Sequence, residues 1–386
     1  MNLFKAFFKS EKSGGFILIF CTILAIAIAN SAWGVGFLHL IHSHLDLSFG
    51  PVQLDLSVEH WVNDGLMAIF FLLVGLEIER ELYVGELSSF RNALLPVLAA
   101  IGGMVVPAGI HLLLNAGTGT QSGFGIPMAT DIAFALGILS LAGNRVPISL
   151  KIFLTALAII DDLGAITVIA IFYTEDLQWA YLLAALGIFT GLFIMGKLKV
   201  YKLVFYLIPG VVMWYCMMQS GIHATIAGVL LAFAIPFNKK STRNSSYYLQ
   251  HLLHKPVAFI ILPLFALVNT AIPIPANALE GLGSNNALGI MLGLVLGKFA
   301  GIMLAVWLAI KSGIANPSQG MSWRLMSGVS ILAGIGFTMS IFITNLAFTD
   351  TSTIITSKLA ILLASLLAAL IGLMVLFSAG KRSRSV

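Results

Sequence analysis

Residues 150–166 read L-K-I-F-L-T-A-L-A-I-I-D-D-L-G-A-I, a run of apolar side chains with two adjacent aspartates, Asp161 and Asp162, near its middle. The surrounding apolar run is long enough to cross the hydrocarbon core of a bilayer as one helix, which takes about 20 residues. Each charge at a helix centre costs about 2.5 to 3.5 kcal/mol on insertion scales. The stretch therefore predicts a membrane helix whose carboxyl groups are retained for a function.

The composition of the whole chain indicates that lipid surrounds most of it. Of its 386 residues, 59% are hydrophobic and 10% are charged, and the mean hydropathy is +1.00. Soluble domains carry about 25% charged residues, and a soluble fold could not cover so much apolar surface. The net charge of +5 does not indicate nucleic-acid binding, because the basic residues lie in short clusters beside apolar runs. Cys21 and Cys216 both lie inside apolar runs, so a disulfide framework is not expected.

Apolar runs separated by charged or Gly/Pro-rich breaks predict an all-α polytopic membrane protein, with twelve spans in a single domain over residues 1–386. The spans are expected near 13–30, 60–84, 94–114, 124–143, 149–173, 180–196, 203–219, 223–237, 254–271, 287–310, 325–348 and 355–378. The first run has the preceding charges and the A-x-A spacing of a signal peptide, but its length favours a retained helix.

The basic residues fall on alternate sides of these spans. Every Lys and Arg except Lys298 and Lys358 lies in one set of loops, and the opposite set holds only Lys358. Lys298 lies in the middle of the tenth span. By the positive-inside rule, the basic loops and both termini are expected in the cytoplasm.

One loop on the opposite side has a pattern of its own. Residues 45–56 alternate apolar and polar side chains around Gly50 and Pro51, which predicts an external β-hairpin. The hairpin either caps neighbouring helix ends or presents a strand edge that pairs with a second subunit. The alternation does not choose between these two interpretations.

Four charged residues fall near the middle of their spans: Asp131, Asp161, Asp162 and Lys298. Unrelieved, they would cost on the order of 10 to 14 kcal/mol, comparable with the stability of a whole domain. Structural pairing can neutralise one carboxylate with Lys298, but three carboxylates exceed one amine. At least one carboxyl group is therefore expected to hold a proton or a cation.

Adjacent residues on a helix point about 100° apart, so one aspartate of the pair can meet Lys298 while the other lines an ion cavity. A carboxylate in this setting holds either a proton or a hard cation such as Na⁺ or Li⁺, and not both. This competition is the physical basis of cation/proton exchange.

Two spans are expected to be discontinuous. The fourth contains Pro127, and the eleventh contains Gly334 and Gly336; such residues free backbone groups that lipid cannot satisfy. The interruptions lie at matching positions of two three-span units, 94–173 and 287–378. This arrangement indicates inverted-topology repeats of helices 3–5 and 10–12, in which helices 4 and 11 are the discontinuous ones. Ordinary glycine-rich helix packing is the alternative interpretation.

Opposed half-helix ends would also account for two of the buried charges. Each helix end carries about half a unit charge. An anion such as Asp131 would be stabilised between two facing N-termini, and a cation such as Lys298 between two facing C-termini.

Six segments together resemble the NhaA family of bacterial sodium/proton antiporters, over nearly the whole chain. They are WVNDGLMAIFFLLVGLE (61–77), PMATDIAFALG (127–137), LKIFLTALAIIDDLGAI (150–166), SGIHATIAGV (220–229), LGKFAG (296–301) and GIGFTMSIFI (334–343). The resemblance implies a transporter of the bacterial inner membrane that exports Na⁺ or Li⁺ in exchange for protons. The exchange would be electrogenic and regulated by pH, and would serve sodium and pH homeostasis. The resemblance implies no cofactor and no enzymatic reaction. It also implies a homodimer joined through the hairpin at 45–56.

The same resemblance implies roles for individual residues. Asp162, Asp161 and Thr130 match the family's Na⁺-binding and proton-carrying group. Lys298 matches the lysine paired with the first aspartate, and Asp131 matches the residue that balances the crossed helices. The remaining matches are Asp64 at a cavity mouth, and Glu77, Arg80, Glu81, His223, His251 and His254 in the pH response. For His223, a helix-end histidine at the interface is an equal alternative.

The chain departs from the family pattern at Gln250, where the family has a glutamate. A glutamine cannot titrate. The resemblance therefore leaves the pH of activation open.

Two other functions are compatible with buried carboxylates. An intramembrane aspartyl protease needs two carboxylates that converge on one water from different helices, whereas Asp161 and Asp162 are adjacent on one helix. A passive cation channel would favour rings of acidic groups along a pore. Single, deeply buried carboxyl groups favour a carrier.

Overall fold

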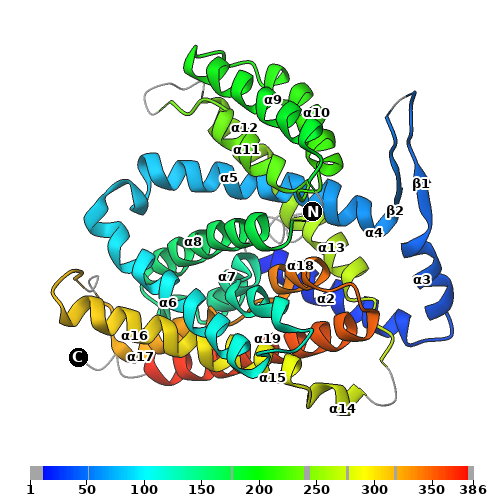
Figure 1. The fold of residues 1–386 in the computed structure, drawn as a ribbon. Helices are drawn as coiled ribbons and strands as arrows, with labels where there is room; N and C mark the ends of the chain where they lie inside the picture. Colours follow the sequence, from blue (N-terminus) through cyan, green and yellow to red (C-terminus); the bar gives the residue numbers. More distant parts are fainter. Residues whose placement is uncertain are drawn as a thin grey trace, which may run out of the picture. The chain divides into compact units, whose positions relative to one another are not determined.

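A computed structural model describes residues 12–50, 52–174, 177–238, 244–274, 278–316 and 320–380. Apart from one small two-stranded sheet, the regular structure of these residues is helical (Figure 1). This follows from the composition, because a helix satisfies its backbone hydrogen bonds internally and can present apolar side chains to lipid on every side. The predicted polytopic helical class agrees with this structure.

Among the described residues, seven helices are long and apolar enough to cross a membrane. They are Val58–Val84, Asn92–Leu114, Ile148–Phe172, Trp179–Lys197, Ser245–Asn269, Asn285–Lys311 and Thr351–Ala379. Three further helix pairs pass the same test but bend sharply: Ser13–Ala29 with Gly34–His42 (113°), Gln121–Met128 with Ile132–Leu141 (40°), and Trp323–Leu332 with Phe337–Ala347 (43°). The structure thus supports seven to ten spans, and twelve spans stay a prediction.

The shortfall from twelve lies in the seventh and eighth expected spans. Val204–Gln219 is an apolar helix of 16 residues, and Ile226–Ala234 is a helix of 9 residues. Both are shorter than the roughly 20 residues that a helix needs to cross the hydrocarbon core alone. The expected eighth span, 223–237, also included residues 223–225 and 235–237, which lie outside the helix Ile226–Ala234.

The chain divides into two compact units. Unit 1 comprises Met1–Ile17, Glu86–Ile169 and Pro275–Val386, and unit 2 comprises Leu18–Gly85 and Ala170–Ile274. Two helices, α2 (Lys12–Ala29) and α8 (Ile148–Phe172), have residues in both. Each unit is described below by itself.

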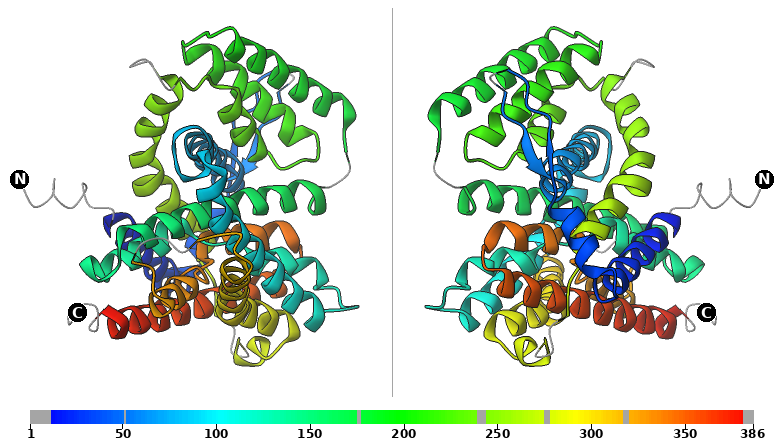
Figure 2. Two further views of the ribbon diagram at one scale, coloured as in Figure 1. Left: turned by 90° about the vertical axis from the view of Figure 1, so that its left-hand side faces the viewer. Right: turned by 90° about the vertical axis from the view of Figure 1, so that its right-hand side faces the viewer.

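Unit 1 is a helical bundle built around close glycine contacts. Its other elements are η2 (Glu86–Ser88), α6 (Phe90–Leu114), η3 (Gln121–Met128), α7 (Ile132–Leu141), η4 (Gly143–Arg145), α14 (Ala278–Leu282), α15 (Asn285–Leu292), η6 (Gly293–Gly297), α16 (Lys298–Lys311), α17 (Trp323–Leu332), α18 (Phe337–Ala347) and α19 (Thr351–Gly380). Helix α6 packs on α16 where Gly102 and Gly301 meet, and a Cβ on either would collide with the carbonyl oxygen of the other. Helix α17 runs beside α19, orange and red in Figure 2.

The two interrupted spans of the sequence prediction both lie in unit 1. The chain bends by 40° between η3 and α7, and by 43° between α17 and α18. Pro127 lies in η3, whereas Gly334 and Gly336 lie between α17 and α18. The structure therefore bends where the sequence has its Gly and Pro interruptions.

Unit 2 holds the remaining helices and the sheet. Its other elements are α3 (Gly34–His42), β1 (His44–Asp46), β2 (Asp55–Ser57), α4 (Val58–His60), η1 (Trp61–Leu66), α5 (Met67–Val84), α9 (Trp179–Lys197), α10 (Val204–Gln219), α11 (Ile226–Ala234), α12 (Ser245–Pro256), η5 (Val257–Ile261) and α13 (Leu262–Asn269). Helices α5 and α11 approach closely at Gly75 and Gly228. Leu76, Tyr206 and Leu231 belong to the apolar core of this unit.

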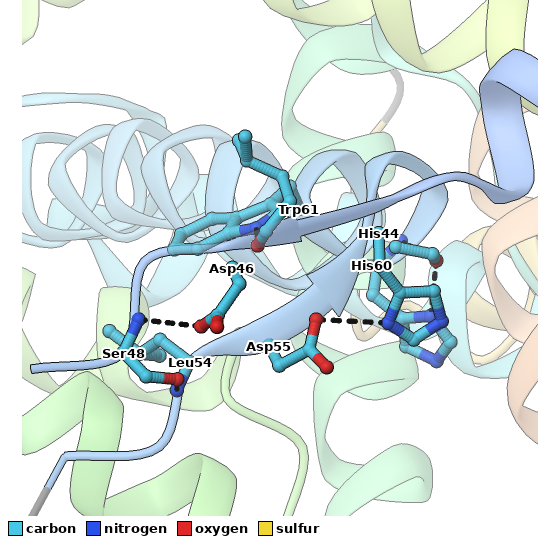
Figure 3. Close-up of polar contacts among 9 residues, drawn as sticks. His44, Asp46, Ser48, Leu54, Asp55, His60 and Trp61 are labelled. Carbon is cyan, nitrogen blue, oxygen red and sulfur yellow. Dashed lines mark hydrogen bonds and ion pairs between the residues drawn. The ribbon is translucent and has the colours of Figure 1, made fainter.

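The predicted hairpin is present as an antiparallel pair of strands. Leu45 of β1 lies opposite Leu56 of β2, and the turn contains Gly50 with a φ of 56°, a left-handed conformation that glycine adopts at little cost. Figure 3 shows Asp46 accepting the backbone N–H of Ser48 at 2.8 Å. Hydrogen bonds from the side chain and then the backbone of Ser48 hold the pKa of Asp46 below its ordinary value of 3.8. Pro51 lies outside the described residues.

Within the described ranges, three π turns interrupt the longer helices. They are η1 (Trp61–Leu66), η5 (Val257–Ile261) and η6 (Gly293–Gly297), and each passes directly into an α-helix. A π turn inserts one extra residue into the helix and frequently marks a functional site. Two of the three lie beside predicted site residues, because η1 contains Asp64 and η6 immediately precedes Lys298.

Candidate cation-binding site

The two adjacent aspartates lie in the buried middle of α8, in unit 1. Asp161 is 0% exposed and Asp162 is 1% exposed. The helix forms there because Leu, Ile and Ala dominate residues 150–166 and no Gly or Pro precedes the pair in that run. The two carboxyl groups thus lie at one depth on neighbouring faces of one helix.

Asp161 forms an ion pair with Lys298, the first residue of α16. The fully buried Lys298 ammonium donates hydrogen bonds to Asp161 Oδ2 and to Thr130 Oγ1, the latter at 2.9 Å. Thr130 Oγ1 lies 2.7 Å from Asp161 Oδ2 and 2.8 Å from the carbonyl oxygen of Ala333. Residues from four segments of the chain therefore meet around the Thr130 hydroxyl group.

The charges of this cluster indicate what it can bind. Asp162 also interacts electrostatically with Lys298, so two carboxylates face one ammonium. Within the described part of the chain, Asp161 Oδ1 has no hydrogen-bond partner. With all three groups ionised, the cluster has one negative charge in excess, which one proton or one monovalent cation would balance. Its carboxylate, hydroxyl and carbonyl oxygens are the ligand types that hard cations prefer.

Asp131 connects the two bent helix pairs at their N-terminal ends. Its Oδ1 accepts the backbone N–H of Phe134 at 2.8 Å, which caps α7, and its Oδ2 accepts the backbone N–H of Thr338 at 3.1 Å. Its own backbone N–H donates to the carbonyl of Ile335 at 2.7 Å. Helix N-termini carry partial positive charge, so a carboxylate is favourable at this position.

The opposite charge lies at C-terminal ends. Lys298 contacts Thr130, which follows η3 by two residues, and Thr130 contacts the carbonyl of Ala333, which ends α17. Carbonyl ends of helices carry partial negative charge, which a cation stabilises. The structure thus brings together Thr130, Asp161 and Lys298 in one cluster and gives Asp131 separate partners.

The residues matched to the pH response lie in unit 2, on α5, α12 and the segment before α11. Arg80 and Glu81 form an ion pair at 2.9 Å, and Glu77 hydrogen-bonds to Gln250 of α12. His251 stacks on Tyr247 with ring centroids 4.2 Å apart. His254 is in the same helix. Helix α5 contacts α12, where Glu77 meets Gln250, whereas His251 and His254 are exposed on α12.

Asp64 and His223 meet elsewhere in unit 2. The Asp64 carboxylate interacts electrostatically with His60 and His223. His223 Nε2 donates to the carbonyl oxygen of Tyr173 at 2.8 Å, which assigns the proton to that nitrogen. The structure therefore brings His223 to Asp64 and gives His251 different neighbours.

Two buried charged residues were not predicted as sites. Glu79 is 5% exposed and accepts a hydrogen bond from Ser246 of α12 at 2.6 Å. Lys358, assigned to an external loop, lies within α19 and is buried, because the helix begins at Thr351. The spacing of Glu77, Glu79 and Glu81 within one apolar span could have drawn attention to Glu79.

The family described as Na+/H+ antiporter 1 matches residues 5–376, almost the entire chain. The chain belongs to this antiporter family. Membership confirms the resemblance stated from the sequence segments. It also makes the chain a secondary transporter with sodium ions and protons as substrates, rather than an enzyme.

Several bacterial relatives in the antiporter family are named Na(+)/H(+) antiporter NhaA. The protein of Flavobacterium psychrophilum is 58% identical over 371 residues, covering 96% of this chain and 94% of the relative. The protein of Dechloromonas aromatica is 56% identical over 373 residues, with 96% and 94% covered. That of Sulfurovum sp. is 47% identical over 382 residues, with 97% of each covered. The family and the apolar helices together identify a multi-pass bacterial membrane protein, and antiporters of this family need no cofactor.

Proposed function

We propose that this antiporter exports Na⁺ or Li⁺ electrogenically in exchange for a larger number of protons, and that Asp161, Asp162, Thr130 and Lys298 form its exchange site. The observation that carries the proposal is the fully buried contact of Asp161 with Lys298, with Asp162 beside it. Two carboxylates and one ammonium together carry one excess negative charge, which one added positive charge would balance. A proton and a cation would compete for this site.

The two aspartates have different tasks in this proposal. Asp162 is the principal Na⁺ ligand, with Thr130 and Asp161 as further oxygen donors. Asp161 takes up a proton. Lys298 opposes this uptake, because its attraction for the ionised carboxylate is lost when the proton binds. Exchange then follows because loading with one ion species requires release of the other.

Everted membrane vesicles with an acidic interior test this function. Adding Na⁺ to vesicles that contain the wild-type protein should cause proton efflux that requires Na⁺, and Asp162→Asn should abolish it. Sodium leakage without proton movement would indicate a channel instead. Normal exchange by Asp162→Asn would contradict the assignment of the site.

We also propose the finer architecture that the family resemblance implies. Residues 1–386 form a single transport domain of twelve spans with both termini in the cytoplasm of a bacterial inner membrane, and helices 4 and 11 cross within inverted repeats. The bends of 40° and 43° and the bonds of Asp131 to both bent pairs support the crossing. A reporter enzyme fused after Asp176 should behave as external; cytoplasmic behaviour would refute this topology.

A homodimer joined through residues 45–56 is a further proposal. Leu45 and Leu47 are about half exposed, and Phe49 is 85% exposed. An exposed strand edge with apolar side chains favours pairing with another chain. In a variant whose native cysteines are replaced, Leu47→Cys should cross-link between two copies in the membrane, whereas Leu183→Cys on the exposed face of α9 should not. Equal cross-linking of both would contradict a hairpin interface.

The pH response is proposed to reside where α5 meets α12. Glu77, Arg80 and Glu81 on one helix and His251 and His254 on the other bring titratable groups to adjoining segments. His223 contributes through its hydrogen bond to the carbonyl oxygen of Tyr173 and its electrostatic interaction with Asp64. A variant with His251 and His254 both replaced by Gln should shift the pH profile of exchange, and an unchanged profile would exclude these two residues.

A further inference from the structure

The π turn η1 is held by a side chain from another helix. Within this turn the N–H of Met67 bonds to the carbonyl of Val62, five residues earlier, as in a π-helix. The carbonyl oxygen of Asp64, inside the turn, accepts a hydrogen bond from the indole N–H of Trp214, at 2.9 Å. A side chain of α10 thus fixes the backbone of the turn at Asp64.

Trp214 is itself held by a second tryptophan. Its ring stacks on that of Trp61, with centroids 6.0 Å apart and planes inclined by 27°. The indole N–H of Trp61 donates in another direction, to the carbonyl of Leu45 in β1, at 3.2 Å. The two indoles share one stack, but their N–H groups have separate acceptors. One bond serves the π turn and the other serves the hairpin.

The backbone of the turn is fixed on its other side as well. The amides of Asn63 and Asn269 bond reciprocally, with Asn269 donating to Asn63 Oδ1 at 2.7 Å. Asn63 and Asp64 are therefore anchored to α13 and α10, respectively. These two anchors hold the backbone that carries the Asp64 side chain, whose carboxylate interacts electrostatically with His60 and His223.

We propose that Trp214 is a positioning residue for transport, which holds the π turn so that the Asp64 carboxylate faces the ion path. The inference rests on the proposed function and on the cavity-mouth position that the family resemblance implies for Asp64, which follows the external hairpin in the chain. Trp214 acts through Asp64 rather than as an ion ligand, so removing its N–H moves the carboxylate and weakens the binding of Na⁺ from the external side without changing the later exchange step.

Right-side-out vesicles with Trp214→Phe test this role, because Na⁺ added outside them meets the external ends of the spans, and because phenylalanine retains the stacked ring and removes the N–H. The apparent KM for external Na⁺, measured as Na⁺-dependent proton efflux, should rise about 2- to 10-fold at an unchanged maximal rate, the effect of one lost hydrogen bond. Asp64→Asn should raise KM similarly. Combining it with Trp214→Phe should produce no further increase, since one residue acts through the other. Trp61→Phe, the matched control, loses only the bond to Leu45 and should keep the wild-type KM.

Several outcomes would overturn the inference. They are an unchanged KM in Trp214→Phe, independent additive effects in the double variant, or the same rise in KM for Trp61→Phe. If Trp214→Phe does not reach the membrane, Trp214→Tyr undergoes the same comparison. Loss of both proteins would contradict the proposal, because it gives Trp214 a purely structural role. Asp162→Asn tests the exchange site separately, so the proposed function stands or fails independently of these results.

Discussion

Asp131 accepts both the backbone N–H and the hydroxyl group of Thr338, although 207 positions separate the two residues in the sequence. The same carboxylate caps α7 through the N–H of Phe134. One side chain therefore serves the N-terminal ends of helices from both bent pairs. Hydrogen bonds to an ionised carboxylate are about twice as strong as neutral ones, so this contact is a principal tie between the two bends.

Thr338→Val should weaken that tie. The variant retains the shape of the side chain but removes one donor to a buried carboxylate, and the free energy of unfolding should fall by about 1.5 to 3 kcal/mol. Chemical unfolding in detergent measures this. Thr344→Val on the same helix is the control, because Thr344 donates to the carbonyl of Ser340 in its own helix. Equal losses in the two variants would show that Asp131 gains nothing from the hydroxyl.

The buried ion pair makes a second prediction. Lys298→Met leaves Asp161 without its cation and should lower the free energy of unfolding by about 3 to 5 kcal/mol. Adding Asp161→Asn removes the unpaired charge and should recover most of that loss. The unfolding midpoints of the two single variants, the double variant and the wild type complete the cycle. Additive losses would mean that the two side chains do not interact.

Gly334 predicts a steric effect at the second bend. A Cβ at this position would collide with the carbonyl oxygen of Leu294, which is backbone and cannot move alone. Gly334→Ala should therefore lower stability by about 1 to 3 kcal/mol and reduce exchange. Gly191→Ala on α9 is the matched control, since its Cβ would meet no atom within 4 Å and alanine favours a helix. Normal exchange by Gly334→Ala would contradict the close contact.

Gln250 offers a prediction about pH. It is 5% exposed and hydrogen-bonds to Glu77, so Gln250→Glu places a second titratable carboxyl group beside the first. Exchange activity measured across neutral and alkaline pH should show a shifted profile, with an unchanged apparent KM for Na⁺ at the optimum. Gln250→Asn, which cannot titrate, should retain the wild-type profile. A changed KM with an unchanged profile would exclude this position from the pH response.

Asp350 makes a prediction at the start of α19. The hydroxyl and then the backbone N–H of Thr353, at 2.7 and 2.8 Å, hold the pKa of Asp350 below its ordinary value of 3.8. The ionised form is favoured in the folded state, so its stabilising contribution is complete above that value and is lost as pH falls through the lower folded pKa. Hydrogen exchange should show protection of the Thr353 amide declining in that range. Asp350→Asn should remove the pH dependence, and an identical decline in both proteins would refute it.

Much of the site could be predicted because buried charge in a membrane is so costly. The cost alone singled out Asp131, Asp161, Asp162 and Lys298, and the structure brings Lys298 to Asp161. The hairpin also followed from local alternation. Both signals are visible in the sequence because lipid and strand pleating constrain residue types position by position.

Features that depend on distant contacts were not predictable. The helices Ser13–Ala29 and Gly34–His42 meet at an angle of 113°. Between them, the side-chain amide of Asn30 donates to the carbonyl of Ile272, 242 positions away. The bond of Glu79 to Ser246 likewise joins two helices far apart in sequence. Periodicity and composition are local quantities, so they contain no record of such partners.

The π turn η6 has a consequence for Lys298, which follows it directly. An inserted residue advances the phase of a helix by about 100°, so the side of α16 from which the ammonium emerges depends on the number of residues in Gly293–Gly297. Within that segment, a single-residue deletion would act as a rotation, turning the lysine away from Asp161 while leaving the apolar character of the helix intact. Length, as much as residue identity, is thus under constraint in this part of the chain.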